Sequence, residues 1–442
     1  MTRLIFILIT LTTILNGSYF WLSRVGLINN ANFEVLIDKN IDFNQRSMVY
    51  LNQPEAITAE IEASFKAEHL RYKKALYDHL YDNSALSLFL KSLKYLLYLI
   101  FLALIFYNAR QSGKPYKLNV VSTIFGIFLL GYSSLSFINF GLAGVIAGFN
   151  SFVFLTCMVF SGNILKQQDL DFFALLLLAT LGFLLVIAPI EMSKGIQVFN
   201  TNSFFKKRMT GFMDQPNTLG IYVVCIFSFF VVQFRSKLGK TRFIMLTLCT
   251  LILIVLSGSN TAAAVLCIVL LAESMLRNNL TISRPGHWVL LLLIVVILSL
   301  YFTQGRPVID SLAGRIEKYN YYFSLDLPAL KLLFGQGLGA GSNTLLQIQS
   351  LFPFEQFADL PIKFSVDSTP LLLIIQTGII GCVVLYCLMF TAFIKDKHRR
   401  PAYLAFFLCG MTINIIEVFP LNIVLALLLS TGLVAKAQKD TP

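Results

Sequence analysis

The chain has 442 residues, of which 56% are hydrophobic and only 13% are charged, and its formal net charge at pH 7 is +12. This composition excludes a soluble protein of the same length and is typical of an integral membrane protein. Because a chain in lipid must satisfy its backbone hydrogen bonds internally, we expect an all-α, polytopic membrane protein, with residues 1–442 forming one membrane domain.

A helix needs roughly 20 apolar residues to cross the hydrocarbon layer. About 12 stretches approach this requirement, which predicts about 12 transmembrane helices. In chain order they cover residues 4–22, 88–107, 118–138, 142–162, 172–190, 216–234, 243–257, 261–276, 287–303, 369–394, 402–418 and 420–435. The seven cysteines all fall within these stretches, where we expect them to pack as small apolar side chains.

The distribution of charge predicts the orientation. If the N-terminus lies inside, the inner segments hold a large excess of Lys and Arg over Asp and Glu, whereas the outer loops are nearly balanced. Basic residues are retained on the cytoplasmic side, so we expect both termini there. Because the basic residues are explained by topology, we predict no nucleic-acid binding.

Two outer loops are long, at about residues 23–87 and 304–367. In the first, Ile57, Ile61 and Phe65 recur at helical spacing among charged residues, which indicates an amphipathic helix, either a solvated lid or a helix on the membrane surface. The second has segments of helical character and is long enough to be suspected of a functional role.

Between the two long loops, the segment 206–217 places three consecutive cations on the outer side. Lys206 and Lys207 fit contact with lipid headgroups, whereas the guanidinium of Arg208 suits bidentate binding of phosphate oxygens. Asn217 follows Pro216, and Pro is tolerated in the first turn of a helix, whose amides attract anions. We interpret this segment as a binding site for a lipid-linked phosphate.

The second long loop adds further candidates. Arg306 follows the end of a span, and Arg315 precedes Tyr319 and Tyr322, which could place a cation and aromatic rings beside a sugar or a phosphate. Interfacial anchoring by the tyrosines is the equally weighted alternative. The outer boundary also carries Glu191 and Glu417.

The glycine run at 335–341 resembles a dinucleotide-binding loop only superficially, because no βαβ pattern surrounds it. We interpret it as a turn that allows close approach of the backbone, with phosphate contact by the amides of Gly337 and Gly339 as the alternative.

Asp367 comes directly before the tenth predicted span, where it could cap the helix or act as a general base toward a sugar hydroxyl. The four histidines have no partners at metal-ligand spacing, so we predict no metal site and no cofactor.

Four motifs in this order resemble the family of O-antigen polymerases and O-antigen ligases, membrane glycosyltransferases of the bacterial envelope. The resemblance covers about residues 200–390 and rests on RMTGFMDQPN at 208–217, LSGSNTAAA at 256–264, GRIEKYNYYF at 314–323 leading to LLFGQGLGAG, and DSTPLLLIIQTGIIG at 367–381. About twelve spans with a large loop between the ninth and tenth also fit the family.

The resemblance implies transfer of a glycan from undecaprenyl pyrophosphate at the periplasmic face of the bacterial inner membrane, without metal or nucleotide. The partners would be a lipid-linked oligosaccharide donor and acceptor, membrane lipids and a chain-length regulator. Arg208 and Arg315 would bind the pyrophosphate and stabilise its developing charge. Asp367 would take the proton of the acceptor hydroxyl.

Two departures from the family bear on the activity. Ligases of the family usually carry a His where this chain has Asp367, and the segment around Ser259 often continues with Arg where this chain has Asn260. The missing His favours a polymerase over a ligase that transfers glycan to lipid A core or to protein. A transporter of lipid-linked glycan is a further alternative, although the ionisable residues concentrate at the outer rim rather than deep in the spans.

Overall fold

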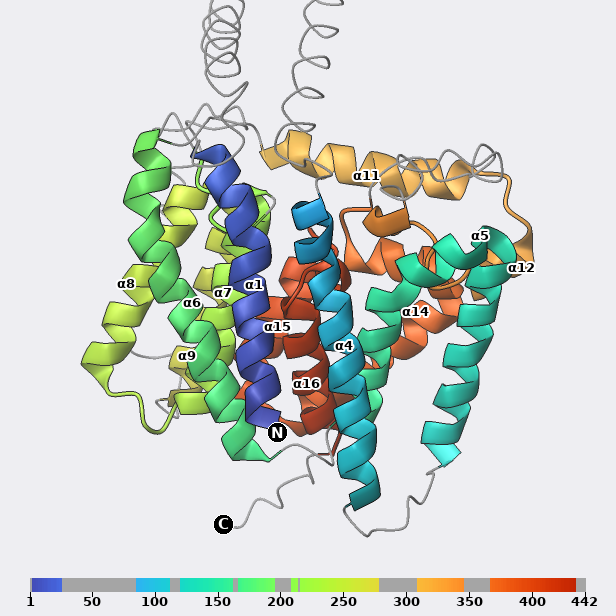
Figure 1. Cartoon of the computed structure of the whole chain (residues 1–442), viewed down its shortest axis with the longest axis horizontal. Helices are drawn as coiled ribbons and strands as arrows, with labels where there is room; N and C mark the ends of the chain where they lie inside the picture. The colour runs from blue at the N-terminus through green and yellow to red at the C-terminus, as the bar shows by residue number, and fades with distance from the viewer. Residues whose placement is uncertain are drawn as a thin grey trace, which may run out of the picture.

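The computed structural model describes residues 2–25, 85–111, 120–161, 166–194, 208–213, 215–277, 308–345 and 366–434. All secondary structure in these ranges is helical, in agreement with the predicted class (Figure 1). Five of the described helices are long and apolar enough to cross a membrane. They are α5 (Val120–Phe160), α6 (Gln167–Lys194), α7 (Pro216–Phe234), α8 (Lys240–Ser257) and α14 (Thr369–Lys395).

The remaining described helices are shorter or less apolar. They are α1 (Thr2–Arg24), α4 (Ala85–Gln111), α9 (Asn260–Arg277), α11 (Val308–Ser324), α12 (Ala329–Phe334), α15 (Arg400–Gly410) and α16 (Leu421–Val434), with 3₁₀ turns η4 (Lys397–Arg399) and η5 (Ile415–Glu417). The predicted span at 287–303 and most of the first long loop lie outside the described residues. All seven cysteines are free thiols, and five are buried as expected, whereas Cys249 is partly buried and Cys387 is exposed.

Most predicted spans coincide with helices, but the predicted span at 402–418 is wrong as a continuous helix. α15 ends at Gly410, and residues 411–420 form an irregular segment that contains only the turn η5. The Thr369 hydroxyl of α14 bonds to this segment, because it accepts a hydrogen bond from Ile415 N and donates one to Ile413 O, each at 3.0 Å. Apolarity alone did not reveal this break, since the segment is nearly as apolar as a span.

The predicted spans at 118–138 and 142–162 fall on two helical arms of α5, which meet at a sharp bend (Figure 1). The bend lies at Gly141, whose φ of 60° is in the left-handed region that glycine tolerates. A second kink occurs in α14 at Gly378, with φ 72°.

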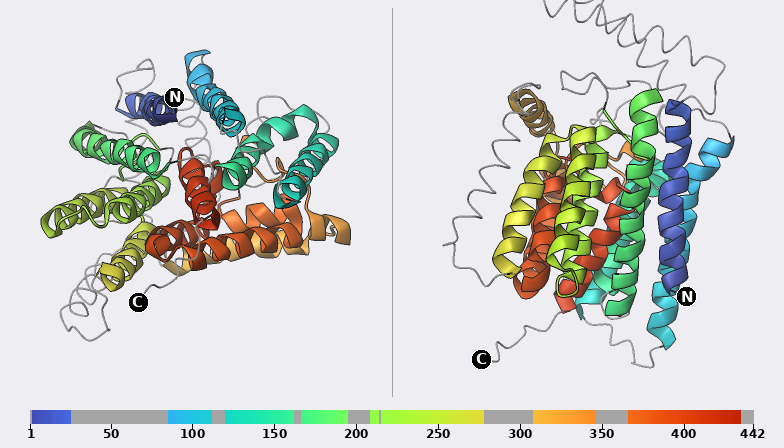
Figure 2. Two further views of the ribbon diagram at one scale, coloured as in Figure 1. Left: turned by 90° about the horizontal axis from the view of Figure 1, so that it is seen from below. Right: turned by 90° about the vertical axis from the view of Figure 1, so that its left-hand side faces the viewer.

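The helices stand side by side as a bundle, and α11 lies across one end of it (Figure 1). We call this the α11 end. α16 lies near the middle of the bundle (Figure 2), and its residues Ile423–Leu429 are almost completely buried. By contrast α8 exposes Met245 and Leu248 by more than half, as expected for side chains that face lipid.

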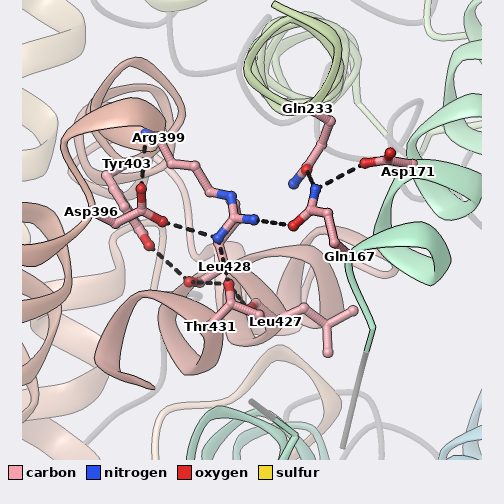
Figure 3. Close-up of polar contacts among 9 residues, drawn as sticks. All are labelled: Gln167, Asp171, Gln233, Asp396, Arg399, Tyr403, Leu427, Leu428 and Thr431. Atoms are coloured by element: carbon pink, nitrogen blue, oxygen red, sulfur yellow. Dashed lines mark hydrogen bonds and ion pairs between the residues drawn. The ribbon is translucent and has the colours of Figure 1, made fainter. Parts of the chain in front are cut away.

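A polar network surrounds η4, which follows the end of α14 that is remote from Thr369; its side chains are drawn in Figure 3. The Arg399 guanidinium donates to Asp396 at 2.9 Å, to Thr431 of α16 at 3.0 Å and to Gln167 of α6 at 2.6 Å. Gln167 in turn donates to Gln233 of α7 at 2.5 Å. Arg399 therefore connects α6 and α16 directly, and α7 through Gln167. The candidate site residues lie elsewhere, at the α11 end.

Candidate functional site

The segment 208–213 is held against the α11 end of α6 by a buried carboxylate. Glu191, which is 5% exposed, accepts hydrogen bonds from Thr210 N at 2.7 Å, Thr210 Oγ1 at 2.9 Å and Gly211 N at 2.9 Å. Gly211 has φ 55°, a conformation that suits glycine. Glu191 thus fixes the backbone that carries Arg208.

Arg208 is itself oriented by the α8–α9 turn. Its Nε donates to Ser257 O at 2.8 Å, and its Nη2 donates to Gly258 O at 3.0 Å and to Asn217 Oδ1 at 2.7 Å. Gly258 is in the left-handed conformation that ends α8, so the carbonyls at this helix terminus meet a cation, which is favourable. Arg208 and Asn217, both predicted to belong to an anion site, are in direct contact at the start of α7.

α11 contacts the residues just before α14 through two consecutive side chains. Lys318 forms an ion pair with Asp367, and the Tyr319 hydroxyl shares a hydrogen bond with Ser368 Oγ at 2.9 Å. The N-cap of α14 is Ser368, so the expectation that Asp367 caps this helix is wrong. α14 starts at Thr369, one residue later than capping by Asp367 would require.

Tyr322 lies one turn further along α11 and is fully buried. Gln336 of the glycine run lies beside its hydroxyl, and burial raises the pKa of that hydroxyl. Arg315 lies on the same helix and is partly buried. Since residues three or four apart share a helical face, Arg315, Lys318, Tyr319 and Tyr322 form one strip along α11.

The glycine run joins α11 to the kinked helices α5 and α14. Gly337 N donates to Gln376 O of α14, and Gly339 N donates to Ser136 Oγ of α5, each at 3.0 Å. A Cβ at Gly339 would lie 2.1 Å from Gly144 O, so only glycine allows this approach. Both amides have protein acceptors, which favours the close-approach interpretation of Gly337 and Gly339 over amide contact with phosphate.

The irregular segment 411–420 supplies a second carboxylate at this site. Glu417 Oε2 accepts a hydrogen bond from Asn343 N at 3.0 Å, while its Oε1 has no hydrogen-bond partner within the described residues. Desolvation raises the pKa of Glu417 to about 7, an effect that the Asn343 amide, Lys94 and the Asn414 side chain partly oppose. Asn414 is 2% exposed, and neither its Nδ2 nor its Oδ1 has a partner in the described part of the chain.

Several predicted residues therefore converge and others do not. Tyr319, Tyr322, Asp367, Gly337 and Gly339 gather where α11, the glycine run and α14 meet. Arg208 and Asn217 form a separate group at the α7–α9 junction, and Arg315 lies on α11. The predicted binding residues Lys206, Lys207 and Arg306 lie outside the described residues.

The sequence did not single out Lys318, Ser368, Asn343 or Asn414. Only Lys318 carried a usable signal, because it lies three residues after Arg315 and therefore on the same helical face. The pairings Asn343–Glu417 and Lys318–Asp367 join residues far apart in the chain.

No protein-family model matches this sequence, and a comparison with characterised proteins finds no match either. Among the described residues, no group of three or more His, Cys, Asp or Glu side chains is placed to hold a metal ion.

Proposed function

We propose that the chain is a polysaccharide polymerase of the O-antigen type, which transfers a growing glycan from undecaprenyl pyrophosphate to a lipid-linked repeat unit. The reaction would take place at the α11 end of the bundle, facing the periplasm of a bacterial inner membrane. The observation that carries the proposal is the convergence of α11, the start of α14, the glycine run and the segment 411–420 on two carboxylates, Asp367 and Glu417.

The role of Arg208 in this proposal is electrostatic. Three hydrogen bonds from Nε and Nη2 hold its guanidinium in one orientation, and Glu191 holds the backbone that carries it. A positive charge fixed in advance stabilises the charge that develops on a leaving pyrophosphate without a cost of reorganisation during the reaction. Arg315 would add a second positive charge from α11.

α11 is placed to receive the carbohydrate. It lies across the end of the bundle, outside the helices that could span the membrane (Figure 1). Its strip of cationic and aromatic side chains lies at the junction with α14. Tyrosine rings and cationic donors suit a glycan whose anionic carrier remains in the bilayer. The Lys318–Asp367 pair and the Tyr319–Ser368 bond fix this strip on α14.

The test is reconstitution of the purified chain in liposomes with lipid-linked oligosaccharide extracted from cells that lack the chain. We expect a ladder of glycans on the lipid carrier, and we expect Arg208→Ala and Arg315→Ala to reduce it at least 100-fold. Removal of one preorganised donor to a transition-state charge costs about 10²- to 10³-fold in rate.

Deletion of the gene in cells separates the polymerase from a ligase. Loss of a polymerase leaves single repeats that are still ligated, whereas loss of a ligase leaves long glycan on the lipid carrier. The second outcome would contradict the proposal. Full activity of both arginine variants would contradict the site while leaving the class of enzyme intact.

A further inference from the structure

The irregular segment between α15 and α16 contacts the first residue of α14. Thr369 is the first residue of α14, and its hydroxyl holds the segment through Ile413 O and Ile415 N. The two residues before Thr369 contact α11, as described above. Glu417 and Asp367 therefore lie on two segments that the Thr369 hydroxyl holds together.

The two carboxylates have different surroundings. Asp367 is 48% exposed at its side chain and is paired with the ammonium group of Lys318. Glu417 accepts a backbone amide bond at Oε2, and its Oε1 is buried without a hydrogen-bond partner in the described part of the chain. A general base works best when its pKa lies near the working pH, and Glu417, with a pKa raised to about 7, meets this requirement.

Asn414 lies next to the Glu417 carboxylate, whose pKa its side chain helps to lower, and the pair together is short of hydrogen bonds. It is three residues before Glu417 and 2% exposed, and both polar atoms of its side chain lack a partner within the described residues. Buried polar groups are nearly always hydrogen-bonded, so such atoms indicate a missing partner. The amide group of Asn414 and the Oε1 atom of Glu417 offer one donor and two acceptors, which match the hydroxyl groups of a sugar.

We propose that Glu417 is the general base of the transfer and that Asn414 binds the acceptor sugar beside it. This inference rests on the proposed polymerase function and assigns to Glu417 the role that sequence reasoning gave to Asp367. Asp367 then becomes a positioning residue that holds α11 through Lys318.

In this step the hydroxyl oxygen of the acceptor sugar forms a bond to the anomeric carbon of the donor glycan. The bond between that carbon and the pyrophosphate oxygen breaks, and the electron pair leaves with the pyrophosphate. The proton of the acceptor hydroxyl passes to Glu417 Oε1. No oxidant, reductant or metal is required for the balance.

The experiment measures initial rates in the liposome assay between pH 5.5 and 8.5 for the wild type, Glu417→Gln and Glu417→Asp. We expect the wild-type kcat to fall below about pH 7 and Glu417→Gln to lose at least 100-fold in kcat, since a general base contributes about 10²- to 10⁴-fold. The KM for the donor should change little. Glu417→Asp should retain an intermediate rate, because it keeps a carboxylate one methylene further back.

Asn414→Ala should raise the KM for the acceptor more than it lowers kcat. Glu317→Gln is the matched control, because Glu317 is an exposed carboxylate on α11. If the wild type forms polymer and Glu417→Gln stays within threefold of it, the inference is overturned and the polymerase function stands. Absence of an acidic limb in the wild-type profile overturns it as well, even if the variants fail to fold. If the wild type forms no polymer, the polymerase function fails together with the inference.

Discussion

Substitution of Glu191 by Gln tests whether a buried carboxylate holds the segment that carries Arg208. The carboxylate accepts three hydrogen bonds, from Thr210 N, Thr210 Oγ1 and Gly211 N. Gln has nearly the same shape, but one of its two terminal groups is a donor instead of an acceptor. If the remaining oxygen stays with Thr210, the Gly211 amide faces another donor.

The expected cost follows from these three bonds. A buried donor left unsatisfied costs about 1 to 3 kcal/mol, and bonds to a charged acceptor are stronger than those to a neutral one. We expect the segment to lose about 2 to 4 kcal/mol of local stability, with part of the loss coming from the two weakened bonds. At about 1.36 kcal/mol per factor of ten, this is roughly a 30- to 900-fold increase in local opening.

The assay is hydrogen–deuterium exchange of the purified protein in lipid nanodiscs, followed by mass spectrometry of peptides covering residues 208–215. The Thr210 and Gly211 amides should exchange faster in Glu191→Gln by the factor given above. Glu317→Gln, the same change at an exposed position, should leave these amides unchanged. If Thr210 and Gly211 exchange at the wild-type rate in Glu191→Gln, the carboxylate does not anchor this segment and our account of Arg208 positioning is refuted.

Three further predictions concern stability. Gly339→Ala places a Cβ 2.1 Å from Gly144 O, so it should destabilise the protein by about 1 to 3 kcal/mol in thermal unfolding, whereas Gly131→Ala, with nothing within 4 Å, should not. Arg399→Gln removes the cationic partner of the largely buried Asp396 carboxylate, which keeps only the bond from the backbone amide of residue 399, and should lower the unfolding temperature, with a cost of up to about 3 to 5 kcal/mol. Because the pKa of Glu417 is raised in the folded state, the native protein binds the extra proton, and stability should fall as pH rises from the ordinary carboxyl range through about 7. Glu417→Gln should lack this slope, which amounts to at most ~3 kcal/mol.

The controls for these predictions use neighbouring positions. Arg400→Gln loses bonds to the carbonyls of Phe393 and Ile394, at 3.2 and 3.4 Å, and a cation–π contact with the Phe393 ring. None of these is an ion pair with a buried carboxylate, so the variant should destabilise less than Arg399→Gln. Equal losses in the two variants would contradict the role of the polar network in Figure 3. Equal pH slopes in the wild type and Glu417→Gln would show that Glu417 does not carry the predicted proton.

The helical class and most helix positions could be predicted because they depend on local properties. A long apolar run has to form a helix in lipid, whatever packs against it. The start of α7 at Pro216 and the end of α8 before Gly258 agree with the predicted span limits, since proline and glycine act on their own backbone.

The interruption after Gly410 could not be read in the same way. The interrupted segment bonds to the Thr369 hydroxyl, which belongs to another helix. Contacts with residues distant in sequence are not visible in the local pattern of apolar residues.

Within the candidate site, charge and hydropathy were enough to predict that cations, tyrosines and carboxylates lie near the ends of the spans. Which of these side chains meet depends on how the helices pack. Lys318 pairs with Asp367, and Asn343 binds Glu417 across 74 residues of sequence. Helical periodicity specifies the face on which a side chain lies, but the neighbour on that face depends on how the helices pack against each other.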